Sequence, residues 1–210
     1  MKARYFILIA LGFIASNTFA QSKSSTPSIS QMVALSWEIN VPSGDKGIIT
    51  ETSLSGGRFE YRKFFTEELS AGFGISLSSV EQYFGTHTYE KPDGSMAVTT
   101  DMVRQALVLP MTITGHWYPS LGFKLLKPYI GIGLGAQYAS QDLFYNIYVI
   151  NNSDWGFVAR PELGTLILFG ENIGALASVA YNYSTNKVDA LGISSMKQVS
   201  FNIGLVFNVD

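Results

Sequence analysis

Polar and apolar residues alternate over long stretches of this chain, most regularly at its C-terminal end. Between Gln198 and Asn208 every odd position from Val199 to Phe207 is apolar, and most even positions are Gln, Ser, Asn or Gly. A period of two places successive side chains on opposite faces of an extended strand. The tail therefore predicts a β-strand with one apolar face and one polar face.

The same alternation occurs in seven further segments. Pro110 and Pro161 fall inside two of them, and each removes a backbone donor, so we expect β-bulges at both prolines. The eight predicted strands are Met32 to Val41, Arg58 to Phe65, Leu69 to Ser78, Gln105 to Tyr118, Pro128 to Ala139, Trp155 to Ile167, Gly174 to Ser184 and Gln198 to Asn208.

The connections between these segments alternate in length. Those after the second, fourth and sixth strands are short: Thr66 to Glu68, Pro119 to Leu125 and Phe169 to Ile173. Those after the other strands are long and polar: Pro42 to Gly57, Ser79 to Arg104, Gln141 to Asp154 and Thr185 to Met196. Short periplasmic turns, longer outer loops and an even strand number are typical of bacterial membrane barrels.

The polar face is rich in Gly, Ser and Asn and carries a few charged residues, and this composition favours a membrane barrel over a soluble one. A soluble ligand-binding barrel places apolar residues inside and charges outside. An eight-stranded barrel has an interior only wide enough for side chains, so small residues and mutually paired charges fit there. A ten-residue strand rises about 33 Å, and when tilted it spans the apolar band of about 25 Å that such barrels present to lipid. We predict an all-β, eight-stranded antiparallel up-and-down transmembrane barrel.

Two sets of residues have predicted places in this barrel. Unpaired buried charge is costly, so we expect the charged residues of the polar face to pair inside the lumen as a plug, in preference to a catalytic or conducting site. Aromatic residues towards the strand ends are expected to form the interfacial girdles. The predicted interior charge network is Glu38, Arg58, Glu60, Arg62, Arg160 and Glu162, and the predicted girdle is Trp37, Trp117, Tyr118, Tyr138, Trp155 and Tyr183.

The first twenty residues form a separate segment. Lys2 and Arg4 precede an apolar run from Phe6 to Ile14, and Thr18-Phe19-Ala20 provides a cleavage site, which together predict a signal peptide. We expect residues 1–20 to be removed, residues 21–31 to form a short N-terminal segment and residues 32–210 to form the barrel. Removal takes away two cations and no acid, so the formal charge falls from −2 to −4. No basic patch points to nucleic acid, and the absence of cysteine excludes disulfides and thiolate metal sites.

Three segments carry a resemblance to a known group of proteins. They are Lys127 to Gly135, where glycine alternates with apolar residues, Arg160-Pro161-Glu162-Leu163-Gly164, and Phe201, Ile203, Leu205 and Phe207 of the tail. The chain resembles the small eight-stranded outer-membrane barrels of the OmpX and OmpW type. The resemblance implies the outer membrane of a Gram-negative bacterium. One departure is that Asn208, Val209 and Asp210 follow Phe207, whereas the assembly signal of these barrels usually ends on an aromatic residue.

Candidate catalytic and metal-binding residues are few. His116, near the end of its strand, is expected to be an interfacial polar residue. His87 lies in a long connection, near Ser78, Ser79, Glu81 and Glu90 in sequence, and is expected to be solvated. Asp142 and Asp154 with Asn151 and Asn152 have the oxygen chemistry of a calcium site, but loop solvation explains them as well. We predict no enzyme activity, no cofactor and no metal.

Three functions stay open at this point. The leading one is a structural or surface-interaction role with a plugged interior. The second, implied by the OmpW-type resemblance, is passage of a small hydrophobic molecule, and the third is modification of lipid A. The aromatic residues Tyr83, Phe84 and Tyr89 of the longest connection either contact a ligand or extend the strands above the membrane. Expected partners are outer-membrane lipid or lipopolysaccharide and the barrel-assembly machinery, and the protein is expected to be a monomer.

Overall fold

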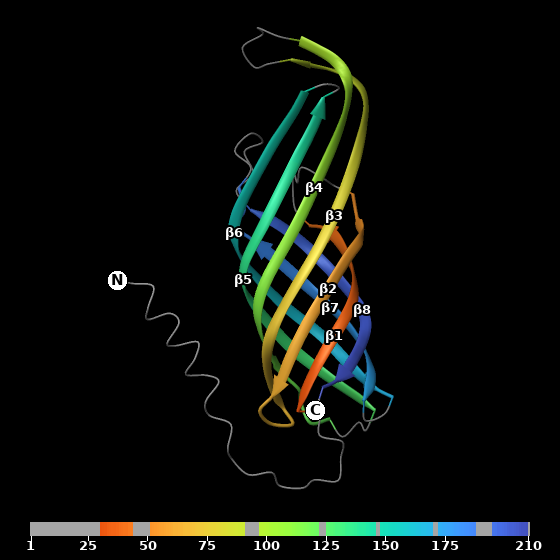
Figure 1. Ribbon diagram of the computed structural model, residues 1–210, viewed down its shortest axis with the longest axis vertical. Coiled ribbons are helices and arrows are strands. Elements are labelled where there is room, and N and C mark those ends of the chain that lie inside the picture. Colours follow the sequence, from red (N-terminus) through yellow and green to blue (C-terminus); the bar gives the residue numbers. More distant parts are fainter. Residues whose placement is uncertain are drawn as a thin grey trace, which may run out of the picture.

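The computed structural model shows a closed antiparallel barrel of eight strands (Figure 1). It describes residues 30–43, 51–90, 97–121, 125–145, 148–169, 172–187 and 195–209, so the predicted signal peptide and the segment up to residue 29 lie outside the described part. Each strand pairs with its sequence neighbours, and β8 pairs with β1 from Met32↔Asn208 to Pro42↔Gln198. The strands are β1 Gln31–Pro42, β2 Ser53–Phe64, β3 Leu69–Glu90, β4 Ala97–Trp117, β5 Leu126–Tyr145, β6 Tyr148–Leu168, β7 Ile173–Ser184 and β8 Met196–Asn208.

The predicted fold class is confirmed, including which face points outward. Along β8, Phe201, Ile203 and Leu205 are exposed, whereas Ser200 and Asn202 are buried. The same division holds around the middle of the barrel, with apolar side chains outside and polar side chains inside. This arrangement is the inverse of a soluble domain, and it suits a protein whose outer surface faces hydrocarbon.

The strands differ in length. The prediction of long loops from Ser79 to Arg104 and from Gln141 to Asp154 is wrong, because β3 to β6 extend into both segments. β3 to β6 are 20 to 22 residues long, whereas β1, β2, β7 and β8 are 12 or 13. Pairing of β3 with β4 continues to Glu90↔Ala97, and pairing of β5 with β6 continues to Tyr145↔Tyr148. A four-stranded sheet therefore rises beyond the rest of the barrel, at the end opposite the short turns (Figure 1). We call residues 78–90, 97–108, 139–145 and 148–154 the projecting sheet.

The projecting sheet differs in polarity from the barrel below it. Its outer face becomes more polar, with exposed Glu81, Asp101, Asn151 and Ser153 beside exposed Tyr83 and Val149. Its inner face becomes more apolar, with buried Met102, Ala106, Val108, Ala139 and Leu143 beside buried Thr100 and Gln141. A sheet with water on its outer side gains stability by burying its apolar side chains on the inner side. The change of polarity thus marks where the lipid-facing surface ends, while the strands continue.

The expected bulges at the two prolines are absent. Pro110 pairs with Gln137 of β5, and β3–β4 pairing is interrupted between Ile75↔Met111 and Ser78↔Val108 with the register unchanged. β6–β7 pairing is likewise interrupted around Pro161, between Ala159 and Glu162, without a register shift. A proline lacks only one donor, so local loss of pairing on that side is sufficient. The register shifts instead between Glu38 and Asn40 and between Phe84 and His87.

The short-turn end of the lumen is closed by an apolar floor. It forms where inward-facing residues near the ends of β1, β5, β6, β7 and β8 meet the turn residue Tyr118. The floor consists of Met32, Ala34, Tyr118, Tyr129, Leu166, Leu168, Leu176 and Val206, with Phe64 packed against it.

None of the described residues belongs to a helix that is long and apolar enough to cross a membrane.

Candidate functional site: the charge network inside the barrel

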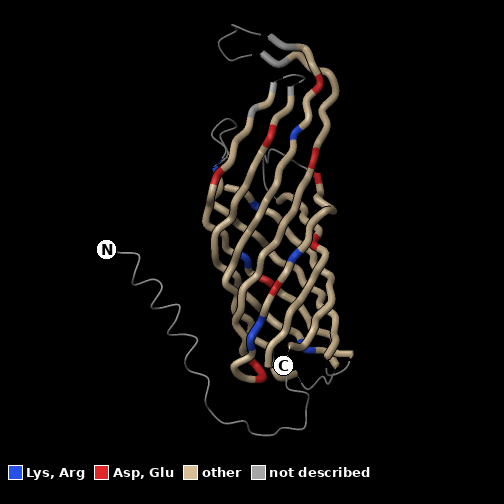
Figure 2. The backbone as a smooth tube through the Cα atoms, in the orientation of Figure 1, with Lys and Arg blue, Asp and Glu red and all other residues tan. Residues whose placement is uncertain are grey.

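The six charged residues predicted to face inward come from three strands, and all six are buried. Glu38 lies on β1, three of the others on β2 and two on β6. The side chains of Arg62 and Arg160 are 0% and 1% exposed, so both guanidinium groups depend on partners inside the protein. Because residues two apart share a face of a strand, Arg58, Glu60 and Arg62 all point into the lumen. Figure 2 shows basic and acidic positions side by side in this part of the wall.

Glu60 is the acceptor at the centre of the lower half of the network. Its Oε1 accepts from Arg62 Nε at 2.9 Å and lies 3.3 Å from His116 Nε2. Its Oε2 accepts from Arg62 Nη2 at 3.1 Å and from Arg58 Nε at 3.4 Å. Arg62 thus binds this carboxylate through two nitrogens, the bidentate geometry that makes guanidinium–carboxylate pairs strong.

Glu162 and Glu38 carry the network across the lumen. Glu162 lies 3.4 Å from both Arg62 and Arg160 and accepts from the Tyr129 hydroxyl at 2.5 Å. Glu38 accepts from Arg160 Nη2 at 3.0 Å and from the Ser76 hydroxyl at 3.3 Å. Three arginines therefore face three glutamates, and each glutamate contacts at least one arginine. The buried charges compensate one another, which is the condition under which burying them is tolerable.

A polar layer lies above the charges. Arg160 Nη1 donates to Asn182 at 3.0 Å, and the Asn182 amide in turn donates to Ser200, which contacts Asn40. Further out, Gln137 donates to Ser184 at 2.8 Å and to Asn186 at 3.1 Å. Amides and hydroxyls thus link β1, β5, β7 and β8 across the lumen above the arginines.

The comparisons with known proteins support the fold of this chain. No family model matches the chain, and no curated protein matches it. Among solved structures, Neisserial surface protein A has a TM-score of 0.56 at 13% identity, over 86% of this chain and 97% of that one. Ail, the attachment invasion locus protein of Yersinia pestis, solved with the heparin analogue sucrose octasulfate, has a TM-score of 0.50 at 14% identity, over 84% of this chain and 96% of that one.

These proteins share the closed eight-stranded architecture, and the lipid-type outer surface is this chain's own. The fold is that of an eight-stranded membrane β-barrel, and the apolar outer surface agrees with it. The resemblance expected from the glycine-alternating fifth strand and the closing strand is confirmed at the level of fold.

His116 belongs to the interior of this barrel and contacts the charge network, a contact that the sequence analysis did not predict. It is 5% exposed, lies beside Glu60 and has Nδ1 3.4 Å from the Ser70 hydroxyl. Its ring also meets Tyr129 edge-on, with centroids 5.3 Å apart. The expected interfacial position is therefore wrong. The signal was present in the alternation, because His116 has the same parity as the inward-facing Thr112 and Thr114.

The prediction that Tyr118 belongs to the interfacial girdle is also wrong. It is 3% exposed and belongs to the floor, where its hydroxyl accepts from Arg62 Nη1 at 2.9 Å. Its backbone N–H donates to Glu68 in the neighbouring turn at 2.7 Å, so the chain at this point turns across the end of the lumen. A tyrosine there closes the barrel and satisfies a buried arginine at the same time.

The other girdle candidates lie on the outer wall of the barrel, at different positions along their strands. Trp117 and Tyr183 are outward-facing near strand ends, and Tyr138 packs against Trp155 with centroids 5.3 Å apart. Trp37 is exposed but lies halfway along β1, where its indole Nε1 donates to the Leu54 carbonyl at 2.6 Å. That bond spans the site at which the β1–β2 register shifts.

The described side chains of the remaining catalytic and calcium candidates do not converge, and the side chain of Glu90 lies outside the described part. His87 is exposed with Nδ1 3.1 Å from the Thr86 carbonyl, while Ser78 faces inward and Glu81 outward on the same strand. Asn151 donates to Asp142 at 2.7 Å, which occupies the carboxylate with an amide. Asp154 instead accepts from the backbone N–H of Lys187 at 2.8 Å.

One group of side chains has the composition of a metal site. The ligand atoms of Glu60, His116 and Glu162 all lie within 4.8 Å of one another. Both carboxylates, however, already accept from arginine, and Arg62 Nη2 reaches the two of them. A cation there would face a guanidinium at close range and disturb a balanced set of charges. The geometry assigns these groups to the ion-pair network.

Proposed function

We propose that this protein is a non-enzymatic structural and surface-interaction barrel whose interior is plugged. The observation that carries the proposal is the lumen itself. The charge network fills its middle, and the apolar floor closes its short-turn end. A route for ions or solutes along the axis would require both layers to separate.

Planar-bilayer recording tests the plug. The wild-type protein is expected to show no steady single-channel conductance. An Arg62→Ser/Arg160→Ser double variant removes the two most deeply buried guanidinium groups and is expected to show open or flickering channels. Steady conductance of the wild-type protein would overturn the plug.

We propose the projecting sheet as the interaction surface. It stands beyond the lipid-facing wall, and its described charges are mainly acidic, Glu81, Asp101, Asp142 and Asp154 against Arg104 (Figure 2). This balance favours cationic partners over polyanions, because opposite charge steers association. Binding of polylysine and of heparin to the protein in nanodiscs tests it. Polylysine is expected to bind in a salt-dependent manner and heparin not to bind, and the reverse result would contradict the proposal.

A second candidate function is supported by one observation. The apolar inner face of the projecting sheet, with Met102, Val108 and Leu143, would suit a small hydrophobic molecule entering from outside. The floor then requires that the molecule leave through the wall. Uptake of an apolar fluorescent dye into vesicles separates the two candidates. Faster uptake with the protein than without it, lost in Met102→Asp, would favour passage.

We also propose the partners that the sequence suggests. Bilayer lipid or lipopolysaccharide covers the apolar wall, the assembly machinery acts on β8 during biogenesis, and the folded protein is a monomer. If the aromatic end of β8 is the assembly signal, Phe207→Ala should lower insertion in cells, whereas Val209→Ala should not. Equal insertion of both variants would contradict this role for Phe207.

A further inference from the structure

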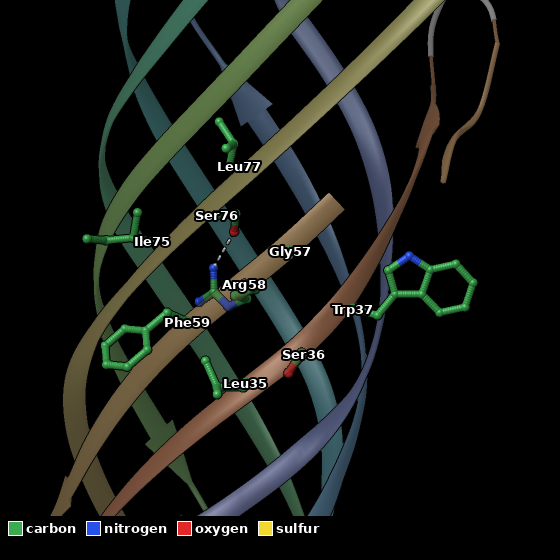
Figure 3. A pocket seen from close by; sticks show the side chains of 9 residues that line it. All are labelled: Leu35, Ser36, Trp37, Gly57, Arg58, Phe59, Ile75, Ser76 and Leu77. Atoms are coloured by element: carbon green, nitrogen blue, oxygen red, sulfur yellow. Dashed lines mark hydrogen bonds between the residues drawn. The ribbon is translucent and has the colours of Figure 1, made fainter. Parts of the chain in front are cut away.

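The lipid-facing wall carries a depression centred on Gly57. Trp37, Gly57 and Leu77 are direct cross-strand neighbours on β1, β2 and β3, so they form one row across the outer face. Leu35, Phe59 and Ile75 form the adjacent row. The absence of a side chain between Trp37 and Leu77 leaves a hollow of about 570 Å³. Figure 3 shows these side chains arranged around Gly57.

Glycine at this position is not required by packing. A Cβ added to Gly57 would meet no heavy atom within 4 Å, whereas one added to the neighbouring Gly56 would collide with the Glu38 backbone. Glycine also weakens a strand interior, because it has no side chain to pack and loses more freedom on folding. Here its effect on the structure is the hollow itself.

The hollow is apolar, because its polar neighbours direct their polar groups away from it. The indole N–H of Trp37 is bonded to the Leu54 carbonyl, so the ring presents only its apolar surface. Arg58 points into the lumen, where Nη1 donates to Ser76 at 3.1 Å and Nε to Glu60 (Figure 3). The exposed side chains of the rim are Leu35, Trp37, Phe59, Ile75 and Leu77.

We propose that this hollow is a binding site for one acyl chain of a bilayer lipid. The argument for this occupant is continuity, since the rim residues are part of the apolar wall that faces lipid on every side of the barrel. A water-soluble ligand would have to enter through hydrocarbon. Beside the hollow the Phe59 and Phe73 ring centroids lie 6.0 Å apart and the Tyr61 and Phe73 ring centroids 5.7 Å apart, so aromatic rings continue the apolar surface. An acyl chain seated in the hollow contacts several side chains at once.

Trp37 provides a direct readout. The chain contains three tryptophans, so Trp117→Phe/Trp155→Phe leaves Trp37 alone at the rim of the hollow. This background is reconstituted into phosphatidylcholine vesicles with and without brominated acyl chains, which quench indole fluorescence on contact. Gly57→Leu is then introduced to fill the hollow. Gly115→Leu is the matched control, because Gly115 also faces outward on β4 and a Cβ there meets nothing within 4 Å.

The proposal predicts strong quenching in the background protein and about twofold weaker quenching in Gly57→Leu, because leucine fills the hollow that Trp37 lines and displaces lipid from it. Gly115→Leu is expected to match the background. Equal quenching in all three proteins would overturn the proposal, since it would mean that lipid reaches Trp37 without using the hollow. A Trp37 that brominated lipid does not quench, with cross-linked dimers, would also overturn it by identifying a second copy as the occupant.

Discussion

The four strands of the projecting sheet also run through the lower barrel, yet they turn different side chains inward in the two regions. In the lower barrel β4 turns Thr112, Thr114 and His116 inward, and in the projecting sheet it turns Met102, Ala106 and Val108 inward. The backbone alternation does not change between them. What changes is the medium outside the wall, hydrocarbon below and water above. The comparison teaches that the polarity of a strand face reports its surroundings, while the period of two reports the strand.

The two regions are also held together differently. The lower barrel is closed by eight strands and filled by ion pairs, whereas the projecting sheet has four strands and an apolar inner face. Its margins are held by local bonds. The Ser53 and Ser55 hydroxyls donate to the Ser79 carbonyl at 2.6 and 2.7 Å, and Asn186 donates to the Asp154 carbonyl at 2.9 Å. We therefore expect the projecting sheet to open independently of the barrel.

The largest effect is expected from breaking the charge network. Arg62→Met leaves Glu60 and Glu162 with less positive charge in a buried site, and removal of one partner from a buried ion pair costs about 3–5 kcal/mol. Urea unfolding of the protein in lipid vesicles measures the loss. Lys63→Met is the control, because Lys63 is the next residue and takes no part in the network as described. A loss no larger than that of Lys63→Met would contradict the network's role.

A smaller and more local effect is expected in the projecting sheet. Met102 is 1% exposed, and truncation of a buried methionine to alanine costs about 2 kcal/mol or more. Met102→Ala should therefore increase hydrogen exchange in β3 to β6 above Ser78 and Val108, while the urea midpoint of the barrel stays unchanged. Asp101→Ala, on the outer face of the same strand, is the control. A shift in the barrel midpoint would show that the two regions unfold together.

A third prediction compares the two faces of the lower barrel with one substitution. A Cβ at the inward-facing Gly72 would collide with the Tyr61 carbonyl, whereas at the outward-facing Gly115 it meets open space. Gly72→Ala should cost about 1–3 kcal/mol by overpacking, and Gly115→Ala should be close to neutral. Urea unfolding of both variants in vesicles measures this. Equal stability would mean that the strands can separate slightly without cost.

These differences explain which parts of the structure the sequence could predict. The eight strands, their order and the inward direction of Glu38, Arg58, Glu60, Arg62, Arg160 and Glu162 follow from the period of two. The strand ends at Ser78 and Gln105 did not, because the predicted strands were traced by an apolar outer face, and that face becomes polar where the lipid ends. The two-residue alternation itself continues beyond both residues, so an assignment based on its period alone would have extended these strands.

The site was predicted only in part for a similar reason. Alternation assigns a residue to a face but not to a depth, since depth depends on strand tilt and on the register with neighbouring strands. Tyr118 lies just beyond the end of β4 and turns across the lumen, so its place depends on the following turn. The pairing of Arg160 with Glu38, residues 122 apart in the chain, likewise requires the closed barrel.

The smallest effect is expected at Trp37, halfway up the wall that separates lipid from the charge network. An indole N–H facing hydrocarbon without an acceptor would be costly, and the bond to the Leu54 carbonyl removes that cost where the β1–β2 register shifts. Trp37→Phe keeps an aromatic ring but leaves the carbonyl without this donor, so it should cost about 0.5–1.5 kcal/mol, the net value of one hydrogen bond. Trp155→Phe, for which no such bond is described, controls for the loss of indole area. If both variants lose the same stability in urea, the tryptophan at position 37 contributes area alone. A larger loss for Trp37→Phe than for Trp155→Phe would mean that the hydrogen bond from the indole N–H to Leu54, at the β1–β2 register shift, stabilises a tryptophan halfway along β1.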